Sequence, residues 1–148
     1  MPLLNFKAQF VPHIRSGRKN HTIRADRKIP VKLGDKLYLY CGLRHKGAYR
    51  ILPEPVTCTK VHTIHIEIVL LNRWVERESV TIDEQNLERD EVQQLARADG
   101  FADWSEMRRF WLDSHGQSKR AMGSRVKTVN FTGQIIHWQH PTEAHVRP

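Results

Sequence analysis

The segment Val56-Thr-Cys-Thr-Lys-Val-His-Thr-Ile-His-Ile-Glu-Ile-Val-Leu-Leu71 decides the fold class of this chain of 148 residues. From Ile64 onward, apolar residues stand at every second position, which is the period of a strand that buries one face. We therefore expect a long central strand over residues 56–71, with a bulge near Thr63, where the alternation is broken.

The residues before this strand predict one short helix and two further strands. Pro12 suits the first turn of a helix, and Gly17 suits the position just past its end, where φ is positive. A short polar strand is expected within residues 18–24, followed by a loop. Residues 36–41 follow a turn signal and alternate in polarity, so we expect a second strand there, and then a loop with a short extended piece over 42–55.

The residues after the central strand predict two helices and a closing strand. The expected order is a short strand over 80–82, helices over 86–98 and 103–115, a basic polar loop over 117–127 and a strand over 128–138. Asp103 and Glu106 resemble a capping box at the start of the second helix. Four large side chains at helical spacing in that helix are interpreted as core, namely Trp104, Met107, Phe110 and Trp111.

This order of elements predicts an α+β fold with a mostly antiparallel sheet, and we favour a small curled β-barrel with flanking helices. The length suits one domain over 1–148, with a core over about 6–138 and a C-terminal tail over 139–148. An apolar content of 39% is enough for a hydrophobic core, which excludes disorder across the whole chain.

Several classes of protein are excluded by what the sequence lacks. It has no apolar run of the length that spans a bilayer and no secretory signal, and its two cysteines form no CxxC, so we expect a cytoplasmic protein without membrane association. No dinucleotide, P-loop, hydrolase or zincin motif occurs, and no cofactor is expected. The paired histidines His62 with His65 and His137 with His140 would point to opposite faces of a strand, so no metal site is expected either.

The positive charge lies in one half of the chain. Residues 1–75 hold 14 Lys and Arg against 4 Asp and Glu, whereas residues 76–148 hold 10 against 12. A basic half is typical of proteins that bind phosphate backbones, although surface charge also serves solubility. Charge alone leaves a nucleic-acid partner and a plain soluble surface equally open.

The densest polar cluster is Ser16-Gly-Arg-Lys-Asn-His-Thr-Ile-Arg24. Its cations, hydroxyl and amide could hold a phosphate or the edge of a base, and the alternative is a solvated edge strand. In a regular strand Lys19 and Thr22 would face opposite ways, so joint action requires Lys19 to lie in a turn or at a bulge.

This cluster, with Gly34-Asp35 and the apolar strand after it, resembles the opening of the ASCH domain family. The similar pattern is Gly-Arg-Lys, two variable residues, Thr-Ile-Arg, and then Gly-Asp. Asp99-Gly100-Phe101, the helix that follows and the strand to Trp138 resemble the later part of the family. The similarity therefore covers the chain from about Phe6 to Trp138.

The resemblance implies a PUA-like β-barrel with flanking helices and a cleft for RNA or a nucleotide-like ligand. Some ASCH proteins are amidohydrolases that deacylate N4-acetylcytidine, and others have been associated with ribonuclease activity. The amidohydrolases use a Lys and a Thr of the motif, which match Lys19 and Thr22, and a Glu further on. That Glu falls near Asp99, whose carboxylate is one methylene shorter.

Two main functions follow, and a third stays open. The leading prediction is binding of RNA or a modified nucleoside in a basic cleft, with ligand contacts from Arg18, Lys19, Asn20, Thr22, Arg24, Tyr40 and Arg44. Tyr40 or Trp138 would offer a face for stacking. The alternative is an amidohydrolase, with Thr22 as nucleophile, Lys19 as its base and Asp99 as acid or orienting group.

The third possibility is a protein-interaction module built on the acidic helices, because residues 76–118 hold 11 Asp and Glu against 5 Lys and Arg. The chain itself is expected to be a monomer or a weak dimer.

Overall fold

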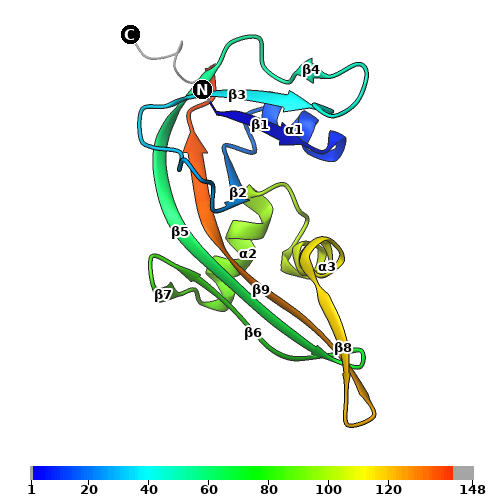
Figure 1. The fold of residues 1–148 in the computed structure, drawn as a ribbon. Helices are drawn as coiled ribbons and strands as arrows, with labels where there is room; N and C mark the ends of the chain where they lie inside the picture. Colours follow the sequence, from blue (N-terminus) through cyan, green and yellow to red (C-terminus); the bar gives the residue numbers. More distant parts are fainter. Residues whose placement is uncertain (1, 142–148) are drawn as a thin grey trace. The chain divides into compact units, whose positions relative to one another are not determined.

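A computed structural model describes residues 2–141. The structure is mixed α+β with more strand than helix (Figure 1). The described residues form two compact units. The first holds 2–61, 98–100 and 135–141, and the second holds 62–97 and 101–134.

The strands are β1 (Leu3–Phe6), β2 (His21–Ala25), β3 (Lys36–Cys41), β4 (Tyr49–Arg50), β5 (Val56–Leu71), β6 (Trp74–Ile82), β7 (Gln85–Asn86), β8 (Gln117–Ala121) and β9 (Ser124–Trp138). The helices are α1 (Val11–Arg15), α2 (Arg89–Ala98) and α3 (Trp104–His115), with a 3₁₀ turn over Ala8–Phe10.

The core of the first unit is made by short strands and α1. Strand β1 pairs in parallel with β3, and β3 pairs antiparallel with β4 and with the start of β5. The inward side chains Leu4, Leu37 and Leu39 are buried. The predicted strand over 36–41 is confirmed, because apolar residues at alternate positions have one face to bury.

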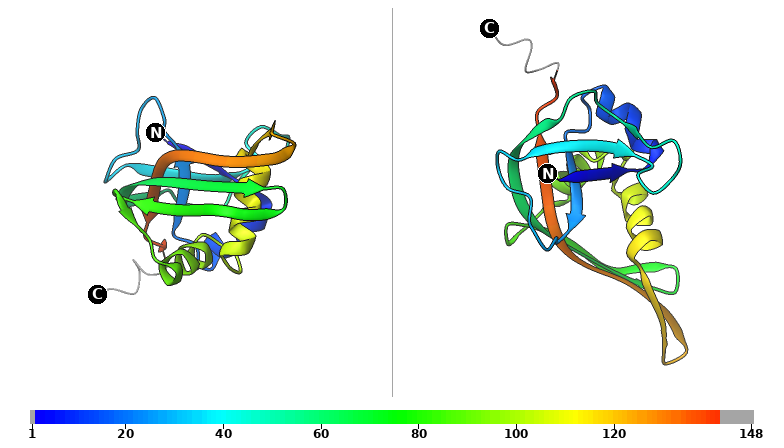
Figure 2. Two further views of the ribbon diagram at one scale, coloured as in Figure 1. Left: turned by 90° about the horizontal axis from the view of Figure 1, so that it is seen from below. Right: turned by 45° about the horizontal axis from the view of Figure 1, so that its top comes forward.

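Strands β5 and β6 form the sheet of the second unit, and Figure 2 shows them side by side. The predicted strand over 56–71 is confirmed, and Ile64, Ile66 and Ile68 are buried on one face. The register shift between β5 and β6 lies at Val69–Leu70, where β6 has one extra residue. The pairing of these two strands begins at Ile64, so it does not test the bulge expected near Thr63.

Three expected boundaries in the second unit are wrong. Strand β6 begins at Trp74 instead of residue 80, because its first six residues are exposed and mostly charged or polar and so show no apolar alternation. The expected basic loop over 117–127 is the hairpin of β8 and β9. Helix α2 begins at Arg89 and not at residue 86, because Gln85 and Asn86 pair with the end of β6 as β7.

Helix α3 begins as expected, and three of its four predicted core side chains are buried, whereas Phe110 is only half-buried. The Asp103 side chain accepts a hydrogen bond from Glu106 N, and Glu106 Oε2 accepts one from Ala102 N. Trp104, Met107 and Trp111 are buried, which confirms them as core. Within residues 2–141, every helix is too short or too polar to cross a bilayer.

Most of the predicted tail, residues 142–148, lies outside the described residues. The part that is described reaches His140, which is buried in the first unit. Its Nε2 donates to Arg15 O at 2.9 Å, so this part of the chain is tied to the end of α1.

Candidate functional site

The segment from Gly17 to Arg24 is fixed in the first unit between α1 and the end of β9. Gly17 has a φ of +83°, which ends the helix and turns the chain. The turn is then held by main-chain bonds: Lys19 N donates to His13 O at 2.9 Å, and Trp138 N donates to Asn20 O at 2.9 Å. The Asn20 amide closes it by donating to Gly17 O at 2.6 Å.

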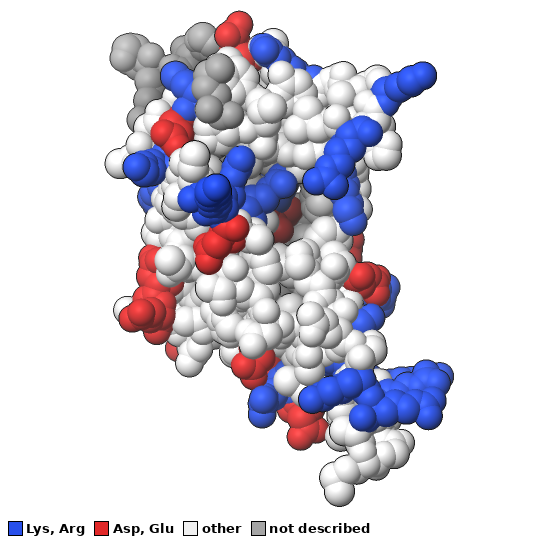
Figure 3. Space-filling view, viewed as in Figure 1, with Lys and Arg blue, Asp and Glu red and all other residues white. Residues whose placement is uncertain are grey.

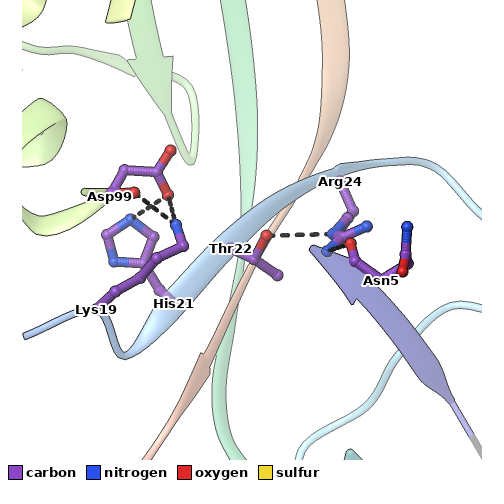
Figure 4. A network of polar contacts seen from close by, with 6 residues as sticks. All are labelled: Asn5, Lys19, His21, Thr22, Arg24 and Asp99. Carbon is purple, nitrogen blue, oxygen red and sulfur yellow. Dashed lines mark hydrogen bonds and ion pairs between the residues drawn. The ribbon is translucent and has the colours of Figure 1, made fainter. Parts of the chain in front are cut away.

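The turn places Lys19 against Asp99, a residue 80 positions later in the chain. Lys19 Nζ donates to Asp99 Oδ1 at 2.5 Å and to Asp99 O at 2.7 Å. Lys19 is 2% exposed and Asp99 7% exposed. Figure 4 shows Lys19 pointing toward Asp99. The ring of Phe10 lies 5.0 Å from Nζ, so the ammonium is enclosed by the carboxylate and an aromatic face.

Burial and mutual attraction act against each other on this pair. Desolvation lowers the pKa of Lys19, and the charge of Asp99 offsets only part of that effect. Burial alone would raise the pKa of Asp99, but Lys19 and His21 outweigh it, and the pKa lies below the usual value. At neutral pH Asp99 is therefore a carboxylate, and Lys19 holds its proton less tightly than an ordinary lysine.

His21 completes this first group. Its Nε2 lies 3.2 Å from Asp99 Oδ1 but without the alignment of a hydrogen bond. Its ring packs against the ring of His137, with centroids 5.4 Å apart. A small change in the orientation of the imidazole would bring Nε2 into hydrogen-bonding alignment with the carboxylate.

A second group is built around Arg24. Arg24 Nε donates to Thr22 Oγ1 at 3.1 Å, and Nη2 donates to Asn5 O. The guanidinium lies 4.6 Å from the centre of the Phe6 ring. Burial lowers the pKa of Arg24 to about 10, helped by Arg27 and opposed by Asp99, so the group stays charged at neutral pH.

The two groups lie on different sides of β2, as Figure 4 shows. Lys19 lies in the turn before β2, and its side chain contacts Asp99 on the same side of the strand as His21. Thr22 lies on the other side, where its hydroxyl accepts a hydrogen bond from Arg24. The structure therefore brings Lys19 and Asp99 together and gives Thr22 a different partner. Thr22 is itself 5% exposed, so its hydroxyl is enclosed as well.

Three buried polar atoms of the first unit have no hydrogen-bond partner among the described residues, namely Asn20 Oδ1, His21 Nε2 and Trp138 Nε1. Buried polar groups are normally paired, and an unpaired one costs about 1–3 kcal/mol. Trp138 N donates a hydrogen bond to Asn20 O, so the two residues are neighbours. An unused acceptor, Asn20 Oδ1, and an unused donor, Trp138 Nε1, therefore lie beside the motif.

The remaining predicted site residues lie elsewhere. Arg18 and Arg44 are exposed, and Tyr40 lies on β3, where its hydroxyl accepts a hydrogen bond from Arg50 Nε at 3.1 Å. Arg50 also lies 5.9 Å from the centre of the Tyr40 ring, so a guanidinium already covers that face. Within residues 2–141, the structure gives none of these three a hydrogen bond or ion pair with either group.

The sequence prediction missed His21 and Asn5 as members of the site. The signal for His21 was present, because it stands two residues after Lys19 and shares its face in an extended segment. Asn5 contributes a main-chain carbonyl, which no side-chain pattern reveals. Residues 2–141 contain no gathering of three or more His, Cys, Asp or Glu side chains that could hold a metal ion.

Comparisons with protein families, with curated proteins and with solved structures found no match in any of the three.

Proposed function

We propose that this chain is an ASCH-type protein with a PUA-like barrel that binds a modified nucleoside, free or within RNA, beside Gly17–Arg24. The observation that supports this most is the buried pair of Lys19 and Asp99. The sequence resemblance pairs these two positions, and a buried charged pair is a poor device for stability alone, because its desolvation penalty offsets most of its attraction.

Burial of this pair favours a small ligand over an open strand of nucleic acid. Lys19 is enclosed and neutralised by Asp99, so it is not available to a phosphate backbone. Arg24 has five N–H donors and uses Nε and Nη2 inside the protein, which leaves donors for a ligand oxygen. The unpaired Asn20 Oδ1 and Trp138 Nε1 add an acceptor and a donor, the two kinds of group that read the edge of a base.

Replacing Arg24 with lysine is expected to weaken nucleoside binding by roughly tenfold or more while keeping the charge. A lysine cannot reproduce the planar fork that bonds Thr22 and Asn5 and still faces a ligand. Calorimetric titration with N4-acetylcytidine, cytidine and a short RNA measures the effect. Arg27→Lys, an exposed arginine nearby, is the matched control and should bind like the unmodified protein. Absence of binding to all three ligands, or equal binding by Arg24→Lys, overturns the proposal.

The second candidate function is amide hydrolysis at the same site, and the lowered pKa of Lys19 favours it. The Thr22 hydroxyl would attack the acyl carbon, and Lys19 would take its proton, which requires the Thr22 hydroxyl to leave Arg24 and reach the Lys19 side of β2. The C–N bond then breaks, the amine leaves with that proton, and water hydrolyses the acyl ester. Since Asp99 is a carboxylate, it orients Lys19 in this scheme.

Incubation with N4-acetylcytidine and chromatographic measurement of cytidine and acetate tests this candidate. We expect Thr22→Ser to retain turnover, because it keeps the hydroxyl, and Thr22→Val to lose at least a hundredfold. Turnover that survives in Thr22→Val, or no turnover by a protein that binds the nucleoside, removes the enzymatic candidate and leaves the binding proposal standing.

A further inference from the structure

The hairpin of β8 and β9 in the second unit carries a basic surface that the proposed site does not use. The strands pair in continuous register from Gln117 with Thr128 to Ala121 with Ser124. Met122 and Gly123 both have positive φ, as a two-residue hairpin turn requires. Figure 1 shows the hairpin as a long two-stranded arm.

The cations of this arm have no acidic neighbours in sequence. Residues 114–141 contain no Asp or Glu, and the arm carries Lys119, Arg120, Arg125 and Lys127. Figure 3 shows Lys and Arg side chains gathered over the arm. Among residues 2–141, the ion pairs of the structure leave out all four.

The pairing places like charges directly opposite each other. Arg120 faces Arg125 across the hairpin, and Lys127, which pairs with Ser118, lies on the same face because it is two residues from Arg125. Directly opposed like charges destabilise a strand pair. An anion bound on this face would relieve that repulsion.

A groove on this arm is held in shape by its neighbours. It has a volume of about 600 Å³, and Asn72, Ser118, Arg120, Arg125 and Lys127 are among the residues that line it. Asn72 N donates to Arg125 O at 2.7 Å, and Arg125 N donates to Asn72 Oδ1 at 3.1 Å, so the turn between β5 and β6 is tied to the arm.

Two of the three acids that β5 and β6 carry in this unit are engaged elsewhere, the exception being the exposed Glu76, and an aromatic ring is exposed beside the turn. Glu67 pairs with Arg77, and Glu78 pairs with Arg108. Trp74 begins β6 two residues after Asn72 and is 79% exposed. Trp74 does not itself line the groove, but it follows the turn that is tied to the arm. Cations that bind phosphates, with an exposed aromatic ring at the neighbouring turn on which a base stacks, are the combination that holds single-stranded nucleic acid.

We infer that the β8–β9 arm binds the phosphate backbone of a single-stranded nucleic acid, with Arg120, Arg125 and Lys127 on phosphates and Trp74 as a stacking platform. The inference does not rest on the proposed function, because the arm and the nucleoside site share no residue. RNA and DNA offer the same phosphate chemistry, and the experiment distinguishes them.

Binding of labelled 20-nucleotide oligo-U and oligo-dT, followed by fluorescence anisotropy across salt concentration, tests the inference. We expect the triple variant Arg120→Gln/Arg125→Gln/Lys127→Gln to bind roughly tenfold or more weakly, with a salt slope lower by up to about 2. The matched control is Arg89→Gln/Arg97→Gln/Arg109→Gln, which removes the same charge from exposed arginines of the acidic helices and should bind like the unmodified protein.

The single variant Arg120→Glu separates binding from folding. It places an acid opposite Arg125, so the hairpin should become slightly more stable while binding falls. Equal binding by the triple variant and its control overturns the inference. So does binding to vesicles of phosphatidylserine and phosphatidylcholine with none to either oligonucleotide, because the partner would then be a membrane surface. Titration of the triple variant with a nucleoside tests the site beside Gly17–Arg24 separately, whichever of these results is obtained.

Discussion

Replacement of Asp99 with alanine should destabilise the fold by about 3–5 kcal/mol. The reason is the partner that remains. Lys19 is 2% exposed and has both of its hydrogen bonds on Asp99, one to the side chain and one to the main chain. Without the carboxylate, folding must bury an ammonium with no counter-charge or release its proton.

Urea unfolding at neutral pH measures the loss. The matched control is Glu67→Ala, which breaks the exposed ion pair with Arg77 at the same kind of distance, 2.9 Å. In that pair Arg77 is exposed and Glu67 is half-buried, so its loss should change the free energy of unfolding by less than about 1 kcal/mol. If Asp99→Ala and Glu67→Ala lower the free energy of unfolding by similar amounts, burial does not determine how much the Lys19–Asp99 pair contributes to stability.

The pH dependence of stability provides a second readout of the same pair. Because the pKa of Asp99 is lower in the folded chain than its usual value of 3.8, the unfolded chain binds a proton first as the pH falls. The stability from this group is therefore present above about pH 4 and is lost as the pH falls through the folded pKa. The difference between the protein and Asp99→Asn should shrink between pH 5 and pH 2.5, and a constant difference would contradict the assignment.

The elements that could be predicted from sequence are those with a local cause. Strand β5 has isoleucines at every second position, and α1 has Pro12 at its start and Gly17 after its end, so local geometry and burial agree. Strand β6 and the β8–β9 hairpin could not be predicted in the same way. Their exposed side chains are largely charged or polar, so they show no apolar alternation. Each is a strand because it pairs across a short turn, β6 with β5 and β8 with β9.

The site shows the same division. Alternation along β2 separates His21 from Thr22, and this was visible in the sequence. Asp99 and Lys19 are 80 residues apart, and their contact depends on how the segment after α2 packs. The spacing of residues in the sequence therefore could not predict this contact. The sequence resemblance suggested this pair, but the unpaired Asn20 Oδ1 and Trp138 Nε1 became visible only from the structure.

The substitution Gly100→Ala is expected to destabilise the protein by about 2–4 kcal/mol, through backbone strain and overpacking together. Gly100 has a φ of +105°, a conformation that residues with a Cβ rarely adopt. A Cβ at this position would also lie 3.0 Å from Phe10 Cδ1. Since Gly100 follows Asp99, whose main-chain oxygen accepts from Lys19, relief of the clash would also shift the buried ion pair.

The control for strain alone is Gly47→Ala. Gly47 has a similar positive φ of +86°, but no atom lies within 4 Å of its added Cβ, so we expect a loss of about 1–2 kcal/mol. The packing part is isolated by Phe10→Leu, alone and combined with Gly100→Ala. If the ring edge causes the clash, the double variant should be more stable than the sum of the single losses predicts, whereas additive losses would assign the whole effect to the backbone. Coupling between the two substitutions would show that Gly100 is required where Phe10, Asp99 and Lys19 pack together, because only a residue without a side chain lets the ring reach the ammonium it covers.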